Sequence, residues 1–236
     1  SSNTDTAGKV VISGTIDSVA STTKQLDIIS GGGAVDLGGV IGGVDALSAL
    51  NINASGGAGK IDVTNIGDGT PSLGVTGTAV LGNASTATLD LDGTNYDVGG
   101  ITFGSDYTFS GSTGNFTTSG NIRFLGNVTL NGDMTLDSGG GTIQFDGNIT
   151  GTTASGDTLT LTDGATNGHE ADITLSGNVG AGGKIKSLVI TSNTGINLGG
   201  TITTSNTNNN NIDLNGPVVL TAATTLDTSA NDGTID

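Results

Sequence analysis

Residues 126–150, GNVTLNGDMTLDSGGGTIQFDGNIT, contain three short runs in which apolar and polar residues alternate. The apolar residues of these runs are Val128 and Leu130, Met134 and Leu136, and Ile143 and Phe145. Because successive side chains of a β-strand point to opposite faces, such alternation indicates strands with one buried face. Gly, Asn or Asp comes after each run, as is typical of turns. The stretch therefore predicts three short strands separated by tight turns.

The composition of the 236-residue chain is consistent with an all-β fold that has a narrow core. Gly accounts for 43 residues and Pro for only 2, which excludes collagen. No apolar run approaches the roughly 20 residues of a membrane-spanning helix, so we expect no membrane insertion. Aromatic residues make up 3% of the chain and Trp is absent, so small aliphatic side chains must fill the core.

The charge balance is strongly acidic, with 22 Asp and Glu against 6 Lys and Arg. The resulting formal charge of −16 repels phosphate backbones, so we expect no nucleic-acid partner. Many of the Asp residues stand beside Gly or Asn, where they form turns and aid solubility, although divalent cations remain candidate partners. The absence of Cys suits an exported bacterial protein that is stabilised by stacking, and we expect an extracellular location at the bacterial cell surface.

Internal repeats decide between the possible all-β architectures. Three pairs of segments align in apolar type and Gly spacing: 8–30 with 141–163, 34–53 with 172–191, and 121–138 with 211–228. They divide one continuous structural domain into a first unit at 1–140, with an insertion at about 60–110, and a second unit at 141–232. Residues 233–236 begin a further unit, because GTID resembles GTIQ at 141–144.

These repeats favour a stack of coils over a β-sandwich or barrel, which is the ordinary interpretation of many short strands. In such a stack each turn pairs its strands with those of the previous turn, and the connections are right-handed. The sequence therefore predicts a right-handed parallel β-helix, or β-solenoid, built from degenerate repeats. We expect the insertion to form extra coils of the same stack, because its strand-like alternation continues.

The chain resembles the repeats of very large bacterial surface proteins. The resemblance is carried by GTIQFDGNITG at 141–151, ADITLSGNVGAGGKIKSLVITSNTGINLGGTITTSN at 171–206 and NIDLNGPVVLTAATTLDTS at 211–229. These motifs look like those of β-strand-repeat, filamentous-haemagglutinin-like and autotransporter-like adhesins. The resemblance implies a right-handed parallel β-helix at the cell surface, and it designates no functional residue.

The leading hypothesis for function is therefore a structural or adhesive module of a bacterial surface fibre or giant adhesin. Its expected partners are neighbouring repeats or identical subunits placed end to end, surface glycans, and proteins of host or partner cells. One alternative is a self-assembling extracellular filament or surface-layer subunit. Another is a carbohydrate-active β-helix enzyme.

The sequence offers little support for catalysis. The single His, His169, stands beside Glu170 and Asp172, and a solvated turn is the simpler interpretation of this cluster. No second His is available for a His-based metal centre, and no Ser-His-Asp arrangement can be assigned. Carbohydrate subsites commonly use Trp, which this chain lacks. We therefore expect that the protein is not an enzyme.

The weak candidates for a metal site are Asp90, Asp92 and Asp97 in LDLDGTNYD at 89–97. They resemble a calcium loop in part but lack the distant Glu of an EF-hand. The simpler interpretation is a solvated strand face, since Asp90 and Asp92 alternate with Leu. GGAGKID at 56–62 approaches a calcium-binding repeat but has Ile61 where Asp belongs. Ca²⁺ is thus the only candidate cofactor that the sequence indicates.

Overall fold

Each turn of the chain lays its strands beside those of the previous turn, and every pairing between named strands is parallel. The computed structural model describes residues 8–54, 60–68, 73–82, 88–91, 96–104, 107–109, 114–117, 120–152, 157–164, 172–205, 211–228 and 233–236, with the backbone only at 54, 88–91, 107–109 and 114–117. No helix occurs in these ranges. The predicted parallel β-solenoid is confirmed.

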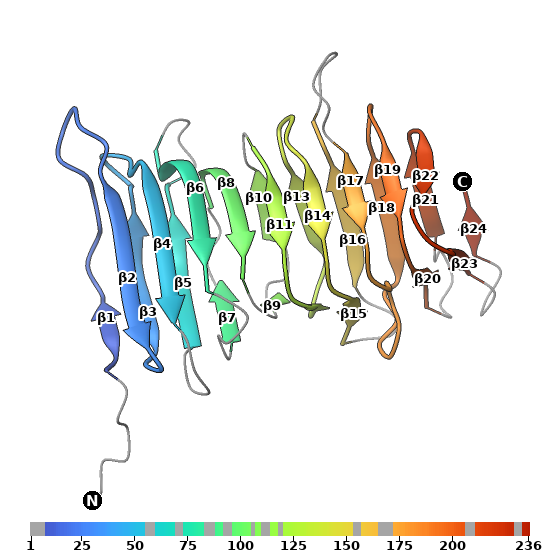
Figure 1. Ribbon diagram of the computed structural model, residues 1–236, viewed down its shortest axis with the longest axis horizontal. Coiled ribbons are helices and arrows are strands. Elements are labelled where there is room, and N and C mark those ends of the chain that lie inside the picture. Colours follow the sequence, from blue (N-terminus) through green and yellow to red (C-terminus); the bar gives the residue numbers. More distant parts are fainter. Residues whose placement is uncertain are drawn as a thin grey trace, which may run out of the picture.

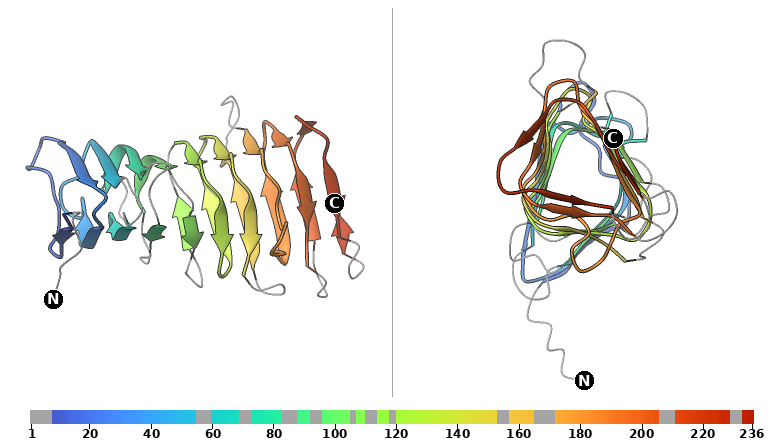
Figure 2. Two further views of the ribbon diagram at one scale, coloured as in Figure 1. Left: turned by 60° about the horizontal axis from the view of Figure 1, so that its bottom comes forward. Right: turned by 90° about the vertical axis from the view of Figure 1, so that its right-hand side faces the viewer.

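The solenoid has a triangular cross-section (Figure 2, right). In Figure 1 the strands nearest the viewer run downward while the chain advances from left to right, which makes the coil right-handed. We name the three sides in the order in which the chain visits them. Side 1 carries the nine-stranded sheet, side 2 the seven-stranded sheet with its two-stranded continuation, and side 3 the six-stranded sheet.

Side 1 holds one strand from each successive turn of the chain. Its strands are β2 (Gln25–Gly31), β4 (Ala49–Ala54), β6 (Val75–Leu81), β8 (Val98–Phe103), β11 (Ile122–Phe124), β14 (Ile143–Phe145), β17 (Ile173–Leu175), β19 (Ile196–Leu198) and β22 (Val218–Leu220). The chain advances 21 residues from Ile122 to Ile143 and 30 residues from Ile143 to Ile173. Turns of different length therefore fit the same stack, because the additional residues lie between the strands.

Side 2 is continuous through isolated bridges at Val179. Its strands are β1 (Val10–Ile12), β3 (Val35–Ile41), β5 (Lys60–Ile66), β7 (Thr88–Leu91), β9 (Tyr107–Phe109), β12 (Val128–Leu130), β15 (Ile149–Gly151), β20 (Thr201–Thr203) and β23 (Thr225–Asp227). Val179 bridges Ile149 of β15 and Ile202 of β20, so it joins the seven-stranded and two-stranded sheets.

Side 3 consists of strands in the later turns and of single bridged residues in the earlier turns. From residue 114 onward it consists of β10 (Gly114–Thr117), β13 (Met134–Asp137), β16 (Thr158–Thr162), β18 (Ser187–Thr191), β21 (Asn211–Asn215) and β24 (Thr234–Ile235). In the earlier turns single bridged residues take this position, where Ile16, Ile41, Ile66 and Tyr96 succeed one another. Strands β3 and β5 reach it by bending, because their register shifts between Leu37 and Val40.

The segment from 60 to 110 contributes to this stack. Strand β5 pairs with β3 and β7, and β6 pairs with β4 and β8. The described residues of the segment thus lie in turns of the solenoid, as the continuing alternation predicted.

The core consists of ladders of apolar side chains that repeat from turn to turn. Ile122, Ile143, Ile173 and Ile196 occupy the same position of four successive turns, and all four are fully buried. Beside them the rings of Phe103, Phe124 and Phe145 stack with centroids 4.3 and 4.6 Å apart. Small branched residues and these aligned rings fill the lumen, as the scarcity of aromatic residues predicted.

Gly is required at corners of the solenoid where neighbouring turns approach closely. A Cβ atom at Gly147 would overlap the carbonyl oxygen of Gly126, and one at Gly177 would overlap that of Gly147. Gly39 meets Gly14 in the same way in the first turns. Each of these Gly residues stands between two buried apolar residues in the motif apolar-x-Gly-x-apolar. We call this motif the corner motif.

Asn side chains bind consecutive turns at the corner between sides 1 and 2. The Asn127 Oδ1 atom accepts a hydrogen bond from the backbone N–H of Asn148 at 2.9 Å. Asn148 Oδ1 accepts likewise from Asn178 at 2.9 Å, and Asn178 Oδ1 accepts from Thr201 at 2.8 Å. This Asn ladder satisfies backbone donors of three successive corners, and it explains why Asn comes directly after Gly in the corner motif there.

Residues that match in the sequence repeats lie on different sides of the triangle. Val35 of β3 is on side 2, whereas its counterpart Ile173 of β17 is on side 1. Ile122 of β11 is on side 1, whereas its counterpart Ile212 of β21 is on side 3. In both cases the residue of the second unit lies on the side that the chain visits immediately before the side of its counterpart. These four residues are nevertheless all fully buried.

Candidate functional site

Three Asp residues occupy in-register positions on adjacent strands of side 2. Asp36 of β3 pairs in register with Asp62 of β5, and Asp62 pairs with Asp90 of β7. Asp36 and Asp62 each stand between two fully buried apolar residues, so their side chains point outward. Parallel pairing places the three residues on adjacent strands, about 4.8 Å apart. We call this row the Asp ladder.

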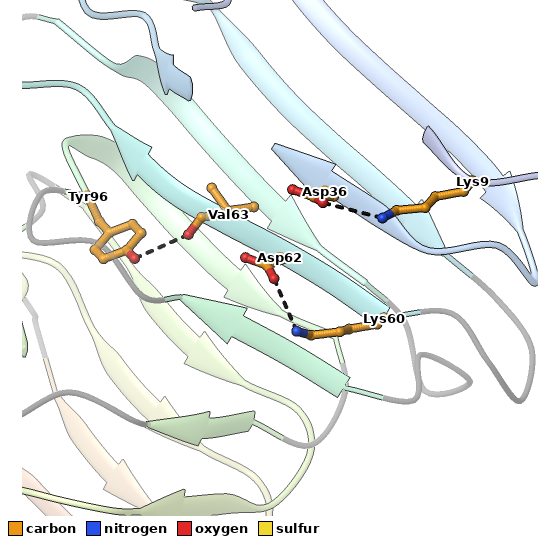
Figure 3. Close-up of polar contacts among 6 residues, drawn as sticks. All are labelled: Lys9, Asp36, Lys60, Asp62, Val63 and Tyr96. Atoms are coloured by element: carbon orange, nitrogen blue, oxygen red, sulfur yellow. Dashed lines mark hydrogen bonds and ion pairs between the residues drawn. The ribbon is translucent and has the colours of Figure 1, made fainter. Parts of the chain in front are cut away.

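Lys side chains partly neutralise the Asp ladder (Figure 3). Lys9 Nζ lies 3.4 Å from Asp36 Oδ2, and Lys60 Nζ lies 3.1 Å from Asp62 Oδ2. The side chains of these two Asp residues remain 40% and 31% exposed, so water screens both pairs. Exposed pairs of this kind contribute about 0–1 kcal/mol each, so they moderate the charge repulsion along the ladder more than they stabilise the fold.

Tyr96 joins its own turn to the end of β5, the strand that contains Asp62 of the Asp ladder. Its ring is buried, and its Oη atom lies 3.3 Å from the Val63 carbonyl oxygen (Figure 3). The same atom lies 3.1 Å from the Thr64 carbonyl oxygen. The hydroxyl can donate to either carbonyl oxygen at the end of β5. A polar atom that would otherwise be buried without a partner is thereby satisfied.

The three predicted metal candidates fall in different places. Asp90 lies in β7, where only the backbone is described, and Asp92 lies outside the described residues. Asp97 continues the backbone ladder of side 3, since its N–H donates to Ile66 at 2.7 Å and its carbonyl oxygen accepts from Val75 at 2.9 Å. The fold thus groups Asp90 with Asp36 and Asp62. Among the side chains that the structure describes, no group of three or more His, Asp or Glu could hold a metal ion.

The Asp ladder was not predicted from the sequence, although a signal for it exists. The triplets Val-Asp-Leu at 35–37, Ile-Asp-Val at 61–63 and Leu-Asp-Leu at 89–91 share one pattern. In the first two triplets Asp points outward between two buried apolar residues. A search for this triplet about one turn apart would have found the ladder.

A second polar cluster lies on side 1, in β2 and β4. The Gln25 Nε2 atom donates to both carboxylate oxygens of Asp27, at 2.7 and 2.8 Å, and Asn51 Nδ2 donates to Asp27 Oδ1 at 2.7 Å. These hydrogen bonds, above all those from Gln25, hold the pKa of Asp27 below its ordinary value. The cluster is a fixed, negatively charged point on the outer surface.

Further along side 1 the outer surface carries a mixed-charge cluster. Arg123 donates to Asp146 Oδ2 through Nε at 3.1 Å and through Nη2 at 2.7 Å. Gln144 Nε2 donates to the other oxygen of the same carboxylate at 2.6 Å. Both carboxylate oxygens therefore have partners within the protein, and the cluster joins β11 to β14.

The remaining sequence candidates lie only partly within the described residues. His169 and Glu170 lie outside the described residues, whereas Asp172 accepts a hydrogen bond from Asn197 Nδ2 at 3.1 Å. Of GGAGKID, the described residues Lys60, Ile61 and Asp62 belong to β5, where Ile61 is fully buried. In its described part this segment is a strand of the core.

The last described turn of side 1 exposes apolar residues whose in-register counterparts are buried in the turns from β4 to β19. Val218 and Leu220 of β22 are 43% and 62% exposed, whereas their in-register partners Ile196 and Leu198 are fully buried. The difference arises because no further described strand lies beyond β22 on side 1.

Comparisons with known proteins identify no relative. No family model matches the chain, and neither a curated protein nor a solved structure matches it. Within the described residues, no helix is long and apolar enough to cross a membrane.

Proposed function

We propose that this chain is a structural or adhesive module of a bacterial cell-surface fibre or giant adhesin. The observation that carries the proposal is the unbroken stack of side 1, where nine parallel strands succeed one another from β2 to β22. Turns of variable length join this stack without interrupting the core, which is how repeat proteins build long rods. The resemblance of the repeats to those of bacterial surface proteins supports the same conclusion.

The outer surface suits contact with hydrated partners. Thr, Asn and Asp dominate the outward positions of the strands, and the Lys and Arg of the three described ion pairs lie against Asp. Such a surface offers hydrogen-bond donors and acceptors at the regular spacing of the strands. Surface glycans and proteins of partner or host cells are the ligands that fit this chemistry.

Labelling of intact cells tests the location that this proposal requires. An antibody against the chain should label the outside of intact producing bacteria, and added protease should remove the label without lysing the cells. Label that appears only after lysis would overturn the proposal.

Binding measurements then separate the adhesive role from the purely structural one. Beads coated with the purified chain should bind partner cells or glycan arrays above the level of beads coated with an unrelated acidic protein if the module is adhesive. Equal binding would leave the structural role. Release of sugars from acidic polysaccharides by the purified chain would replace both roles with an enzymatic one.

A further inference from the structure

We propose that residues 180–186, GAGGKIK, bind an oxyanion group, a carboxylate or a sulfate, of an acidic polysaccharide. We call this segment the basic loop. The inference rests on the proposed function in that it assigns a site and a ligand class to the adhesive role. Three features support it: the excursion of the loop from the stack, its two Lys side chains and its Gly-rich backbone.

The basic loop lies where the chain passes from side 2 to side 3. Two bridges to the next turn enclose most of it, since Val179 bridges Ile202 and Ile185 bridges Thr204. Val179 and Ile185 are six positions apart, whereas Ile202 and Thr204 are only two positions apart. The four additional residues exceed what the wall of the solenoid can hold between the two bridges. They therefore form an excursion from the stack.

The two Lys side chains of the basic loop point outward from the same face. Ile185 stands between Lys184 and Lys186, and it is fully buried and bridged to the next turn. Because successive side chains of an extended segment alternate, both flanking Lys residues are directed away from the core. Their Cα atoms are about 6–7 Å apart at the rise of a strand, so the two flexible ammonium groups can reach one bound anion.

Neither Lys of the basic loop forms an ion pair with the residues that the structure describes. The cations of the three described ion pairs are Lys9, Lys60 and Arg123, and each lies against an Asp. The ammonium groups of Lys184 and Lys186 thus differ from these three in being available to an external anion.

The corners on either side of the basic loop add little negative charge at the surface. In the preceding turn Asp157 accepts a hydrogen bond from the Lys186 N–H through its backbone carbonyl oxygen at 2.7 Å. Its side chain is buried, and Asp157 Oδ2 accepts from the Thr152 N–H at 3.0 Å. The sequences of 153–156 and 206–210 contain no charged residue. The basic loop is therefore a local positive region on a chain whose formal charge is −16.

The Gly-rich part of the basic loop adds backbone donors. Gly180 and Gly182 have left-handed φ values of 78° and 83°, whereas Ala181 between them does not have a positive φ. Successive residues of opposite hand direct their N–H groups into one concavity, which is an anion-binding arrangement called a nest. No described residue accepts a hydrogen bond from the N–H groups of 181–183, and Ala181 and Gly182 are exposed. These donors are accessible to the same anion as the two Lys side chains.

The surroundings of the basic loop favour a polysaccharide as the carrier of the anion. Ammonium and N–H groups bind carboxylate and sulfate oxygens through charge-assisted hydrogen bonds. Beside the loop, Thr201 and Thr203 of β20 flank the buried Ile202, so their hydroxyl groups face outward, where sugar hydroxyls can bind. Duplex DNA carries one negative charge per about 1.7 Å, and the acidic remainder of the chain repels such a dense polyanion. A polysaccharide with sparser acidic groups avoids most of this repulsion.

Binding of the purified chain to immobilised polygalacturonate, dextran sulfate and neutral dextran tests the site. The wild-type chain should bind at least one of the two acidic polymers, should not bind neutral dextran, and should bind less tightly as salt is added. Lys184→Gln and Lys186→Gln should each lower the affinity by about threefold to tenfold. Lys24→Gln is the matched control, because Lys24 is exposed at another corner and also lacks an ion pair within the described residues. It removes the same charge and should leave the affinity unchanged.

A backbone variant tests the nest while retaining both Lys charges. Gly182→Ala introduces no overlap, since nothing lies within 4 Å of the added Cβ, but it disfavours the left-handed φ of this residue. It should therefore weaken binding to the acidic polymer, with circular dichroism unchanged. Unchanged affinity in Gly182→Ala would overturn the role of the backbone donors.

The three polymers and a DNA probe decide the ligand class. Binding to polygalacturonate alone or to dextran sulfate alone supports the proposal and identifies the anion as a carboxylate or a sulfate. Binding to neither, or an equal loss of affinity in Lys24→Gln, would overturn the site. Tighter binding to duplex DNA than to both acidic polysaccharides would overturn the choice of a polysaccharide.

The outcomes separate this inference from the proposed function. A chain that antibody labels on the cell surface but that binds neither acidic polymer would refute the site and leave the structural role intact. A chain that binds an acidic polymer through the basic loop but occurs only inside cells would refute the proposed function and leave the site intact.

Discussion

The corner motif lies at different corners of the triangle in the two halves of the molecule. In the first turns Gly14 and Gly39 stand where the chain passes from side 2 to side 3, and β3 bends there with a shift of register. In the later turns Gly147 and Gly177 stand where the chain passes from side 1 to side 2. The local geometry is nevertheless the same, because each Gly backbone touches the Gly of the preceding turn.

This difference shows that the repeat encodes a corner and its two inward neighbours, and that it does not encode a side. A triangular coil has three similar corners, so a repeated segment can begin at any of them. The number of residues between the segments decides which corner the motif occupies. A solenoid can therefore accept insertions that are not whole turns.

The two halves also differ in the residue directly after the corner Gly. The later turns have Asn127, Asn148 and Asn178, whose side chains form the Asn ladder. The earlier turns have Thr15 and Val40 at the matching positions. Close packing of Gly is thus common to both halves, whereas the Asn ladder belongs to the later one.

The largest effect is expected where the two halves meet. Phe124 is stacked between Phe103 of the earlier half and Phe145 of the later half. Phe124→Ala removes contacts on both sides and should lower the free energy of unfolding by about 3–5 kcal/mol. Phe124→Leu, which retains most of the volume, should cost clearly less. Denaturant titration measures both, and a loss in Phe124→Leu equal to that in Phe124→Ala would contradict this expectation and assign the effect to the ring stack instead of the filled volume.

Gly substitutions test whether the corner motif is equivalent in the two halves. Gly39→Ala and Gly177→Ala should each lower the free energy of unfolding by about 1–3 kcal/mol, because the new Cβ overlaps the backbone of the preceding turn. Gly14→Ala is the matched control, since nothing lies within 4 Å of its added Cβ. Thermal unfolding of the three variants decides the question. A neutral Gly39→Ala beside a damaging Gly177→Ala would break the equivalence.

The Asn ladder should account for a smaller difference between the halves. Asn148→Ala leaves the Asn178 N–H without its protein acceptor and should cost about 0.5–1.5 kcal/mol of unfolding free energy. Thr15→Ala, at the matching position of the earlier half, should change stability by less than about 0.5 kcal/mol. Chemical denaturation with hydrogen exchange at Asn178 measures the effect. Unchanged exchange at Asn178 in Asn148→Ala would show that the ladder contributes nothing.

The smallest effect is expected at Asp27, on the outer surface of the earlier half. Gln25→Ala should raise the Asp27 pKa toward its ordinary value, because the largest stabilisation of the carboxylate is lost. A lowered folded-state pKa contributes stability above the unfolded pKa of about 3.9, and this stability is lost as pH falls through the folded value. The wild type and variant should therefore differ in stability at neutral pH and converge in acid. Carboxyl NMR titration reports the pKa directly, and an unshifted Asp27 in Gln25→Ala would contradict the assigned cause.

The fold class and the inward positions were predictable from the sequence. Alternation in 126–150 identified Val128, Met134 and Ile143 as inward residues, and all three are buried. The repeats then favoured a coil, because stacked turns bury such short strands on one another. These inferences succeeded since the period of two residues and the need to bury apolar surface act locally.

The sides and the candidate site were not predictable in the same way. The side on which a strand lies depends on every corner that precedes it, and corners differ in length. The sequence grouped Asp90 with Asp92 and Asp97 because they are neighbours in the chain. Parallel pairing placed Asp90 beside Asp62, a residue one turn away. The register between turns depends on how the turns stack, so no pattern within a single segment predicts it.

The backbone polarity of the turns has a consequence for how the chain acquires its structure. Inward residues such as Val128 and Ile149 donate their N–H groups to the next turn, so each folded turn presents the bonding groups that its successor needs. The paired residues of successive turns lie 18–30 positions apart in the chain, and this separation does not grow with the length of the rod. Such short-range closure keeps the entropy cost of each step constant. A chain that emerges amino-terminus first, from a ribosome or from an export pore, can therefore fold vectorially, with each completed turn serving as the template for the residues that arrive next.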